Sequence, residues 1–115
     1  MKNKQVCKDF VRGEISKTKH LFTENKEGVL ILYSYGYHFP LSIKLLDNTI
    51  LINGRGYSQT TSQHKGDLCR CLGFENFKGL EENKTNDILI FNTEQLKEIL
   101  DKGFKTKPEI IEDKI

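Results

Sequence analysis

The stretch LSIKLLDNTILI, residues 41–52, decides the fold because two strands and the turn between them can be read from it. Its first half alternates apolar and polar residues, which is the pattern of a strand with one buried face. Asp47 and Asn48 then offer a two-residue turn. Closing this turn places the apolar side chains of both halves on one face, with the pairs Leu45–Ile50 and Ile43–Ile52. We therefore predict an antiparallel hairpin with strands at 39–46 and 49–53.

Apolar runs on either side of the hairpin predict two further strands. Residues 29–35 begin with a continuous apolar run rich in β-branched and aromatic side chains, which Gly36 then interrupts. Residues 88–91 form a second run, and we expect it to be a short buried strand of the same sheet. The polar segment 14–28 is expected to be a loop or an irregular extended segment, and the segment 73–87 is expected to be mostly a connection.

The segment after the hairpin carries the signal of a helix start. Thr60 and Gln63 have the spacing of a capping box, in which two side chains satisfy free amides at the beginning of a helix. The predicted helix covers 61–72 and stops at Gly73. Its inner face is expected to consist of His64, Leu68, Cys71 and Leu72.

Two more helices are predicted near the ends of the chain. The Asn-Thr pair at 92–93 is suited to cap a helix at 93–102 that stops at Gly103. A short amphipathic helix at 6–11 is expected to end at Gly13. The inner stripe of the C-terminal helix is expected to consist of Leu96, Ile99 and Leu100.

Together these elements predict a single α+β domain over residues 1–115. A small antiparallel sheet is expected to be packed on one face by two or three short helices, among them 61–72 and 93–102. The tail at 105–115 is expected either to form one more turn after Pro108 or to fray.

Composition excludes some classes of protein. The chain of 115 residues has a formal net charge of +2, with seven Lys and Arg against three Asp and Glu in residues 1–26 and seven against ten in residues 73–115. The basic excess is too small to indicate nucleic-acid binding by itself. No stretch approaches the roughly 18 apolar residues of a membrane span, and the first residues lack the apolar core of a signal peptide. We therefore expect no membrane partner and a location in the cytoplasm.

The three His and three Cys residues show no metal-ligand spacing, so neither a metal ion nor another cofactor is expected. His64 and Cys71 share a helix face but lie about 10 Å apart along the axis, which is too far for one ion. Cys69 and Cys71 are poor disulfide partners because they are only two residues apart. The thiols are therefore expected to be reduced.

The block YSQTTSQH at 57–64 has two interpretations. A helix start presents free amides and a partial positive charge, so the hydroxyls together with Arg55, His64 and Lys65 would complete a phosphate pocket. The block lacks the glycine-rich cradle of a P-loop. In the favoured interpretation Thr60 and Gln63 cap the helix and Ser58 and Thr61 satisfy amides of the loop. His64 is then a hydrogen-bonded residue on the inner face.

The aromatic block at 33–39 also has two interpretations. Fully extended, it would form a base-stacking platform of Tyr33, Tyr35, Tyr37 and Phe39. Gly36 favours a turn instead. In that case Tyr33 and Phe39 belong to the core, and the residues near the loop tip are Tyr35, Tyr37 and His38.

No set of residues has the spacing of a catalytic signature, so no catalytic residue is assigned and a non-enzymatic role is favoured. Cys69 or Ser62 near His64 lacks an orienting acid. His64 with a hydroxyl or with Glu14 would suit general acid–base chemistry. A metal-independent phosphodiesterase that uses His64 as acid or base therefore remains a third hypothesis.

Two sequence blocks together resemble a family of small uncharacterised proteins from phages, archaeal viruses and plasmids. The blocks are SYG-x-HFP and YS-x-TTS-x-H, and the matching residues are Ser34, Tyr35, Gly36, His38, Phe39, Pro40, Tyr57, Ser58, Thr60, Thr61, Ser62 and His64. The resemblance covers about residues 10–72 and does not include the acidic C-terminal third. It implies an accessory protein of a virus or mobile element, for which antagonism of host defence is a common role.

Because the two blocks occur together, we expect them to lie close in space and to form a binding site. Its residues are expected to be Tyr35, Tyr37, His38, Arg55, Tyr57, Ser58, Thr60, Thr61, Ser62, His64 and Lys65. The leading hypothesis is an anti-CRISPR-type inhibitor that binds a host defence protein or ribonucleoprotein complex, as a monomer or a homodimer. The alternative is a small nucleic-acid-binding or nucleotide-binding protein that uses the basic N-terminus, Arg55, Lys65 and the helix amides.

Overall fold

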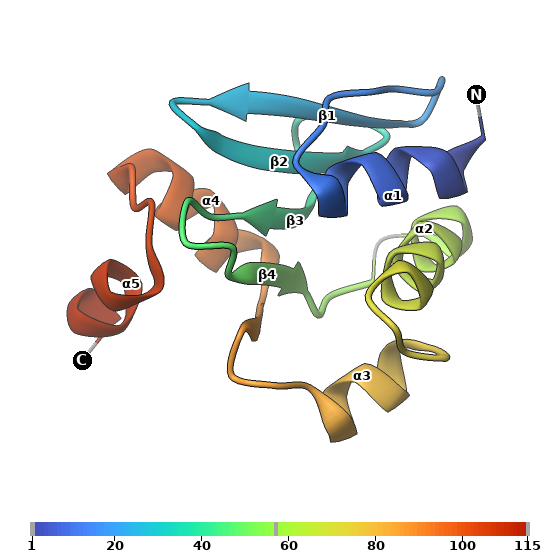
Figure 1. Cartoon of the computed structure of the whole chain (residues 1–115). Coiled ribbons are helices and arrows are strands. Elements are labelled where there is room, and N and C mark those ends of the chain that lie inside the picture. The colour runs from blue at the N-terminus through green and yellow to red at the C-terminus, as the bar shows by residue number, and fades with distance from the viewer. Residues whose placement is uncertain (1, 57, 115) are drawn as a thin grey trace.

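The computed structural model describes residues 2–56 and 58–114, which form five strands and five helices (Figure 1). The strands make one sheet in the order β1-β2-β3-β4-β5. Their bounds are β1 Leu21–Lys26, β2 Val29–Ser34, β3 Pro40–Lys44, β4 Ile50–Asn53 and β5 Ile88–Phe91. The helices are α1 Asn3–Arg12, α2 Gln59–Cys71, α3 Phe77–Asn83, α4 Thr93–Lys102 and α5 Lys107–Lys114. The predicted α+β class is confirmed.

The sheet combines an antiparallel meander with one parallel pair. β1 to β4 follow one another and pair antiparallel, whereas β5 runs parallel to β4, with Ile50 opposite Ile88. A parallel pair requires a crossover connection, which α2 and α3 supply (Figure 1). This connection brings the chain back to the level at which β4 starts, so β5 runs in the same direction as β4. The sheet is therefore mixed rather than purely antiparallel.

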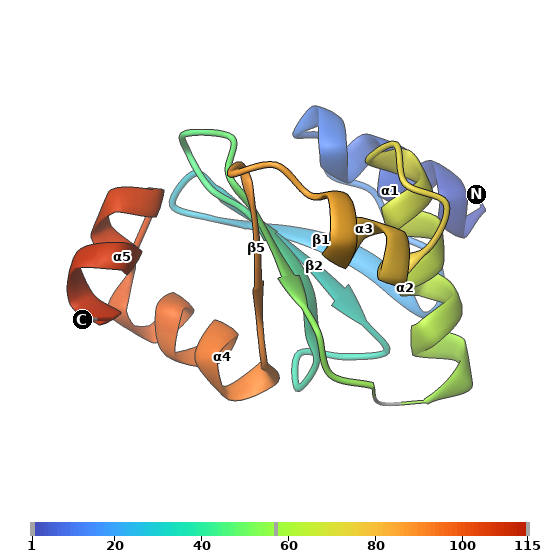
Figure 2. The same ribbon diagram turned by 90° about the horizontal axis from the view of Figure 1, so that it is seen from below.

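Helices cover both faces of the sheet (Figure 2). α1, α2 and α3 pack on the face that carries Leu30 and Leu32, and α4 and α5 pack on the face that carries Ile31 and Ile43. β2 and β4 are buried at every position and β3 at all but its last, and a strand buried on both faces needs a cover on each. The expectation that the helices near 61–72 and 93–102 share one face is therefore wrong.

The central hairpin forms, but its register differs by one residue from the predicted one. The observed pairs are Ser42–Ile52, Ile43–Leu51 and Lys44–Ile50, in place of Leu45–Ile50 and Ile43–Ile52. The turn contains three residues instead of two, since the Leu45 N–H donates to the Thr49 carbonyl at 2.9 Å. Because both faces of this hairpin are buried, the apolar pattern satisfies either register and cannot choose between them.

Asn48 closes this loop in the left-handed conformation, with φ of 70°. We expect Asn48→Ala to lower the free energy of unfolding by about 1 kcal/mol. Alanine is disfavoured in the left-handed conformation because its Cβ is crowded there and it lacks the polar side chain with which Asn bonds to the nearby backbone. Asn48→Gly should stay within about 0.5 kcal/mol of the wild type. Both variants lose the hydrogen bond from Lys44 Nζ to Asn48 Oδ1 at 3.0 Å, so their difference in urea denaturation isolates the backbone effect. Equal losses in the two variants would contradict this explanation.

Two elements lie in segments that were expected to be irregular. β1 pairs with β2 along its whole length, from Leu21 opposite Ser34 onward, and only its first half is substantially buried. α3 begins at its N-cap Asn76 and buries Leu80 completely. An edge strand and a short surface helix both contain few apolar side chains, and for this reason their sequence patterns resemble those of loops.

α2 begins two residues earlier than predicted. The N-cap is Ser58, whose Oγ accepts a hydrogen bond from the Thr61 N–H at 3.1 Å, and the expected Thr60–Gln63 capping box is replaced by this interaction. On the inner face His64 and Leu68 are buried as predicted, whereas Cys71 and Leu72 are only half-buried. The other buried residues of the helix are Thr61, Lys65 and Cys69.

The ends of the remaining helices follow the sequence signals more closely. α1 ends at Gly13, which adopts the left-handed conformation, and α4 starts with a capping box formed by Asn92 and Gln95. The C-terminal segment forms α5, whose Ile110 side chain is buried against the face of the sheet that α4 covers. The helical alternative for the tail is thus the one observed over Lys107–Lys114.

Candidate functional site

The two polar blocks meet where the start of α2 lies against the end of β2. Ser34, the last residue of β2, has its Oγ 2.8 Å from His64 Nδ1 and 3.1 Å from Thr61 Oγ1. All three residues are at most 1% exposed. The two blocks are therefore close in space, and they are connected through buried side chains.

The other ring nitrogen of His64 faces α1. Asn3 Nδ2 donates to His64 Nε2 at 3.2 Å, and the Thr18 hydroxyl donates to Asn3 Oδ1 at 2.6 Å, which fixes the orientation of the amide. Because an amide NH2 group only donates, Nε2 must accept, and the ring proton lies on Nδ1 and is donated to Ser34. We refer to these five residues, Asn3, Thr18, Ser34, Thr61 and His64, as the His64 network.

Burial lowers the pKa of His64; the charge of Asp67 opposes this effect and that of His20 adds to it. Protonation would also turn Nε2 into a donor that faces the Asn3 amide, another donor. The folded protein therefore holds the neutral imidazole, and no exposed positive charge is supplied by this ring.

This lowered pKa predicts a dependence of stability on pH. In the unfolded chain His64 titrates near pH 6.5, so below that pH the unfolded state binds a proton that the folded state does not. The stability contributed by neutral His64 is complete above about pH 6.5 and is lost as the pH falls toward the lowered folded pKa. We expect the urea midpoint to decrease between about pH 7 and pH 5.

A variant without a titratable ring tests the assignment. His64→Gln should show an almost flat urea midpoint over the same pH range, because the carboxylates with lowered pKa, such as Asp9 and Asp47, titrate at more acidic pH. If the variant retained the full decrease of the wild type, the pH dependence would have to come from another group.

The hydroxyls around Ser58 serve α2 itself. Ser58 Oγ accepts from the Thr61 N–H and also donates to Thr61 Oγ1 at 3.2 Å. Thr60 is half-buried and Ser62 is exposed on the outer side of the helix. Tyr57, also expected in the site, lies outside the described residues. Ser58 thus caps the helix, the role expected of Thr60 and Gln63, and the Thr61 hydroxyl bonds to the side chains of Ser34 and Ser58 instead of to loop amides.

Lys65 is not positioned to receive a phosphate. Its side chain is buried, and its Nζ donates to the Arg55 carbonyl at 2.9 Å and lies 4.5 Å from the centre of the Phe77 ring. Burial also lowers the pKa of this amine. Lys65 thus fixes the loop after β4 against α2 and α3, instead of contributing an exposed charge.

The aromatic block turns back on itself, as Gly36 indicated. Tyr33 and Phe39 are buried, and Tyr35 has φ of 72°. The ring of Tyr35 lies 4.7 Å from His20 and 6.2 Å from His64, measured between ring centres. The core-and-turn interpretation is therefore confirmed.

Tyr37 belongs to a separate aromatic group. Its ring lies 4.9 Å from Tyr33 and 5.3 Å from Phe22, and its hydroxyl donates to Glu24 at 2.7 Å. Tyr33 and Phe22 lie on the face of the sheet that α4 covers, whereas Tyr35 lies beside the His64 network. A single stacking platform formed by these tyrosines is not present.

His38 and Arg55 lie at a third place, beside the start of α4. They line a hollow of about 420 Å³ together with Phe39, Gly56, Thr93, Glu94 and Lys97. The residues expected to form one site are thus distributed over three locations. The structure brings Tyr35, Ser58, Thr61 and His64 together, and it separates Tyr37, His38 and Arg55 from them.

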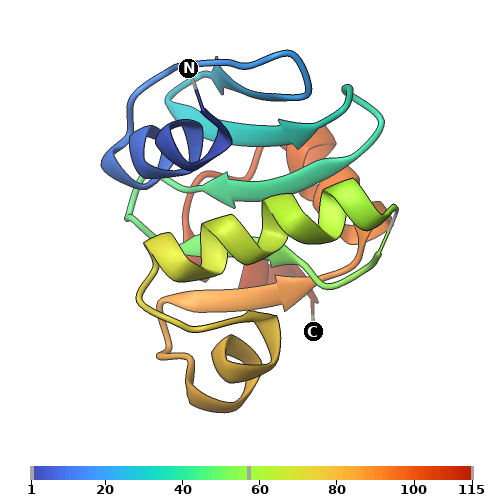
Figure 3. The ribbon, with the colours of Figure 1, turned by 90° about the vertical axis from the view of Figure 1, so that its right-hand side faces the viewer.

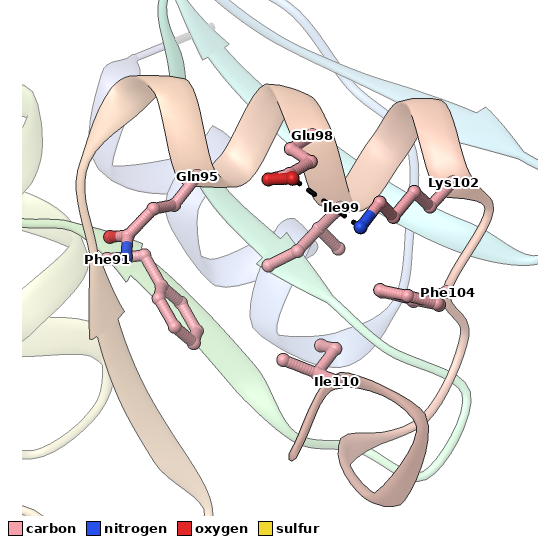
Figure 4. Close-up of a pocket in the computed structure, with 7 residues that line it drawn as sticks. All are labelled: Phe91, Gln95, Glu98, Ile99, Lys102, Phe104 and Ile110. Atoms are coloured by element: carbon pink, nitrogen blue, oxygen red, sulfur yellow. Dashed lines mark ion pairs between the residues drawn. The ribbon is translucent and has the colours of Figure 1, made fainter. Parts of the chain in front are cut away.

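Sequence reasoning did not anticipate a hollow of about 270 Å³ between β5, α4 and α5 (Figure 4). Its floor is apolar, and Lys102 and Glu98 form an ion pair of 3.5 Å at its rim. The apolar lining consists of Phe91, Ile99, Phe104 and Ile110. Phe91, Ile99 and Ile110 belong to three consecutive elements and Phe104 lies in the loop between α4 and α5, so the hollow depends on how these elements pack together.

The nucleophilic side chains described here are poorly placed to react with a substrate at the surface. Ser34 and His64 have the spacing of a nucleophile and a base, but both side chains are sealed from solvent. Burial raises the pKa of the Cys69 thiol to about 11 and also raises that of Cys7. Within residues 2–56 and 58–114, no three His, Cys, Asp or Glu side chains converge to hold a metal ion.

In the part of the chain that the structure describes, no helix has both the length and the apolar character needed to cross a membrane. Comparisons with models of protein families, with curated proteins and with solved structures found no match. Any functional argument therefore depends on the residues of this chain.

Proposed function

We propose that the protein is a viral or mobile-element accessory protein that antagonises host defence in the host cytoplasm by binding a defence protein or ribonucleoprotein complex without catalysis. The observation that supports this proposal is the His64 network. It joins Ser34 of one sequence block to Thr61 and His64 of the other through internal hydrogen bonds and thereby fixes the position of the residues around it. The resemblance of the two blocks to those of viral and plasmid proteins supports the same proposal.

The surface above the network is suited to binding. Tyr35 is 39% exposed and is held between His20 and His64, so a large amphipathic ring is presented in one orientation. Ser58 and Ser62 lie exposed on the adjacent turn of α2. Preorganised tyrosines are common anchors of protein interfaces, because their contact area is large and little conformational entropy is lost on binding.

A plating assay in a host with active CRISPR interference tests this proposal. Expression of the protein should restore plating of a targeted phage, and Tyr35→Ala should reduce the restored plating by roughly tenfold or more. Tyr37→Ala is the matched control, since it removes the same ring from the opposite side of the sheet and should have little effect. Equal loss in both variants, or no restoration in any defended host, would argue against the proposal.

A further inference from the structure

The outer side of α1 carries a row of positive charges that the proposed antagonism does not use. Lys4, Lys8 and Arg12 recur every four residues, and Lys2 joins Lys4 and Lys8 around a hollow of about 420 Å³. The helix buries its opposite side in the core, with Val6, Cys7 and Phe10. At 1.5 Å per residue, the row is about 12 Å long. We refer to Lys2, Lys4, Lys8 and Arg12 as the basic face of α1.

Little negative charge balances this face. Among residues 2–56 and 58–114, no carboxylate lies within the 4.0 Å of an ion pair from any of the four cationic groups. The acid of α1, Asp9, is 9% exposed and accepts a hydrogen bond from Gln5 Nε2 at 2.8 Å. Arg12 is close enough to help lower the pKa of Asp9, so the three lysines carry most of the excess charge.

The neighbouring helix, α2, adds no net negative charge beside the basic face of α1. α1 and α2 lie on the same face of the sheet (Figure 3), and Cys71 Sγ lies 3.9 Å from the Lys4 carbonyl. Arg70 of α2 is paired with Asp67 at 2.6 Å, so this part of α2 is neutral overall. The positive potential is therefore concentrated on α1.

The chemistry of this face fits phosphate groups better than it fits a protein surface. Exposed lysines bind phosphate as point charges and need no fixed orientation. The exposed tyrosines of the described residues, Tyr35 and Tyr37, lie in the loop after β2, so this face offers neither an aromatic anchor for a protein nor a stacking partner for unpaired bases. The partner that fits this face best is the regularly spaced phosphate backbone of a nucleic acid.

We propose that the basic face of α1 binds the phosphate backbone of double-stranded nucleic acid without reading its base sequence. This inference does not rest on the proposed antagonism. Of the nucleic-acid site expected from the sequence, only the basic N-terminus is retained, because Lys65 is buried and the start of α2 is capped by Ser58.

Fluorescence anisotropy with a labelled DNA duplex of about 20 base pairs tests the proposal. At about 50 mM salt we expect a dissociation constant on the order of 10⁻⁵ M, equal for two unrelated sequences. If all four cations contact phosphates, the slope of log K against log salt should be about −3 to −4. Lys4→Glu with Lys8→Glu should weaken binding by about tenfold or more and reduce the slope by about two.

The matched control is Lys84→Glu with Lys97→Glu, which makes the same change in net charge at exposed positions away from α1. This pair should change the affinity by less than about twofold. Equal loss in both double variants would overturn the proposal, as would the absence of duplex binding at low salt. Competition by poly-glutamate as effective as that by the unlabelled duplex would also overturn it, in favour of an acidic protein partner.

A second double variant guards against misfolding. Lys4→Gln with Lys8→Gln removes the charges without reversing them and should show the same direction of effect, while circular dichroism reports whether each variant retains its helices. Retained duplex affinity in a folded Gln variant would overturn the proposal. None of these outcomes affects the antagonism proposed above, which is measured through Tyr35.

Discussion

Phe10→Ala is expected to lower the free energy of unfolding by about 3–5 kcal/mol, which is a large part of the stability of a small domain. Phe10 is completely buried in the core that α1 shares with α2 and the sheet. Removing the ring leaves a cavity that the two helices cannot close without moving. Urea denaturation followed by circular dichroism measures the loss.

Val11→Ala is the control for this change, because Val11 is the next residue of α1 and is only half-buried. Its cost should be about 1 kcal/mol or less. If Phe10→Ala is unfolded without urea, Phe10→Leu provides a milder change that should cost about 1–2 kcal/mol. A loss below about 1 kcal/mol for Phe10→Ala would mean that α1 is not packed on the sheet as described.

His64→Ala is expected to lower the free energy of unfolding by roughly 2–4 kcal/mol. The imidazole connects Ser34 of the sheet to Asn3 of α1, and its removal leaves the buried Ser34 hydroxyl and the half-buried Asn3 amide without this partner. Each buried group that loses its hydrogen bond costs about 1–3 kcal/mol, partly offset because the ring no longer needs to be desolvated.

Ser62→Ala on the exposed side of the same helix should change stability by less than about 0.5 kcal/mol and serves as the control. Combining Ser34→Ala with His64→Ala should cost less than the sum of the two single changes, by about 0.5–3 kcal/mol. Additive losses would show that the 2.8 Å contact between these side chains contributes nothing of its own.

The sequence predicted those elements whose signals are local. The Asn92 cap and Gly103 define α4, and the strands of the central hairpin were located within a few residues of their observed bounds. The hairpin register was wrong because a three-residue loop and a two-residue loop are both compatible with Asp47 and Asn48. The placement of α2 and α4 on opposite faces depends on tertiary packing, about which periodicity contains no information.

The site was predicted in part for a similar reason. The block of hydroxyls indicated a helix start, and the aromatic block indicated a turn, so the contact between them followed from their joint occurrence. Asn3 was not anticipated because 61 residues separate it from its partner His64. The burial of Lys65 depends on Phe77 of α3, an element that the sequence did not reveal.

The parallel pairing of β5 with β4 has a consequence for the order in which the chain assembles. β1 to β4 are joined by short turns, so a nascent chain that has emerged as far as Asn53 already contains every partner of the antiparallel pairs. The β4–β5 pair must wait for α2 and α3, and closing that long loop costs more entropy. During synthesis the edge of β4 therefore stays unpaired until β5 has emerged, and an early intermediate would associate with a second chain at this edge.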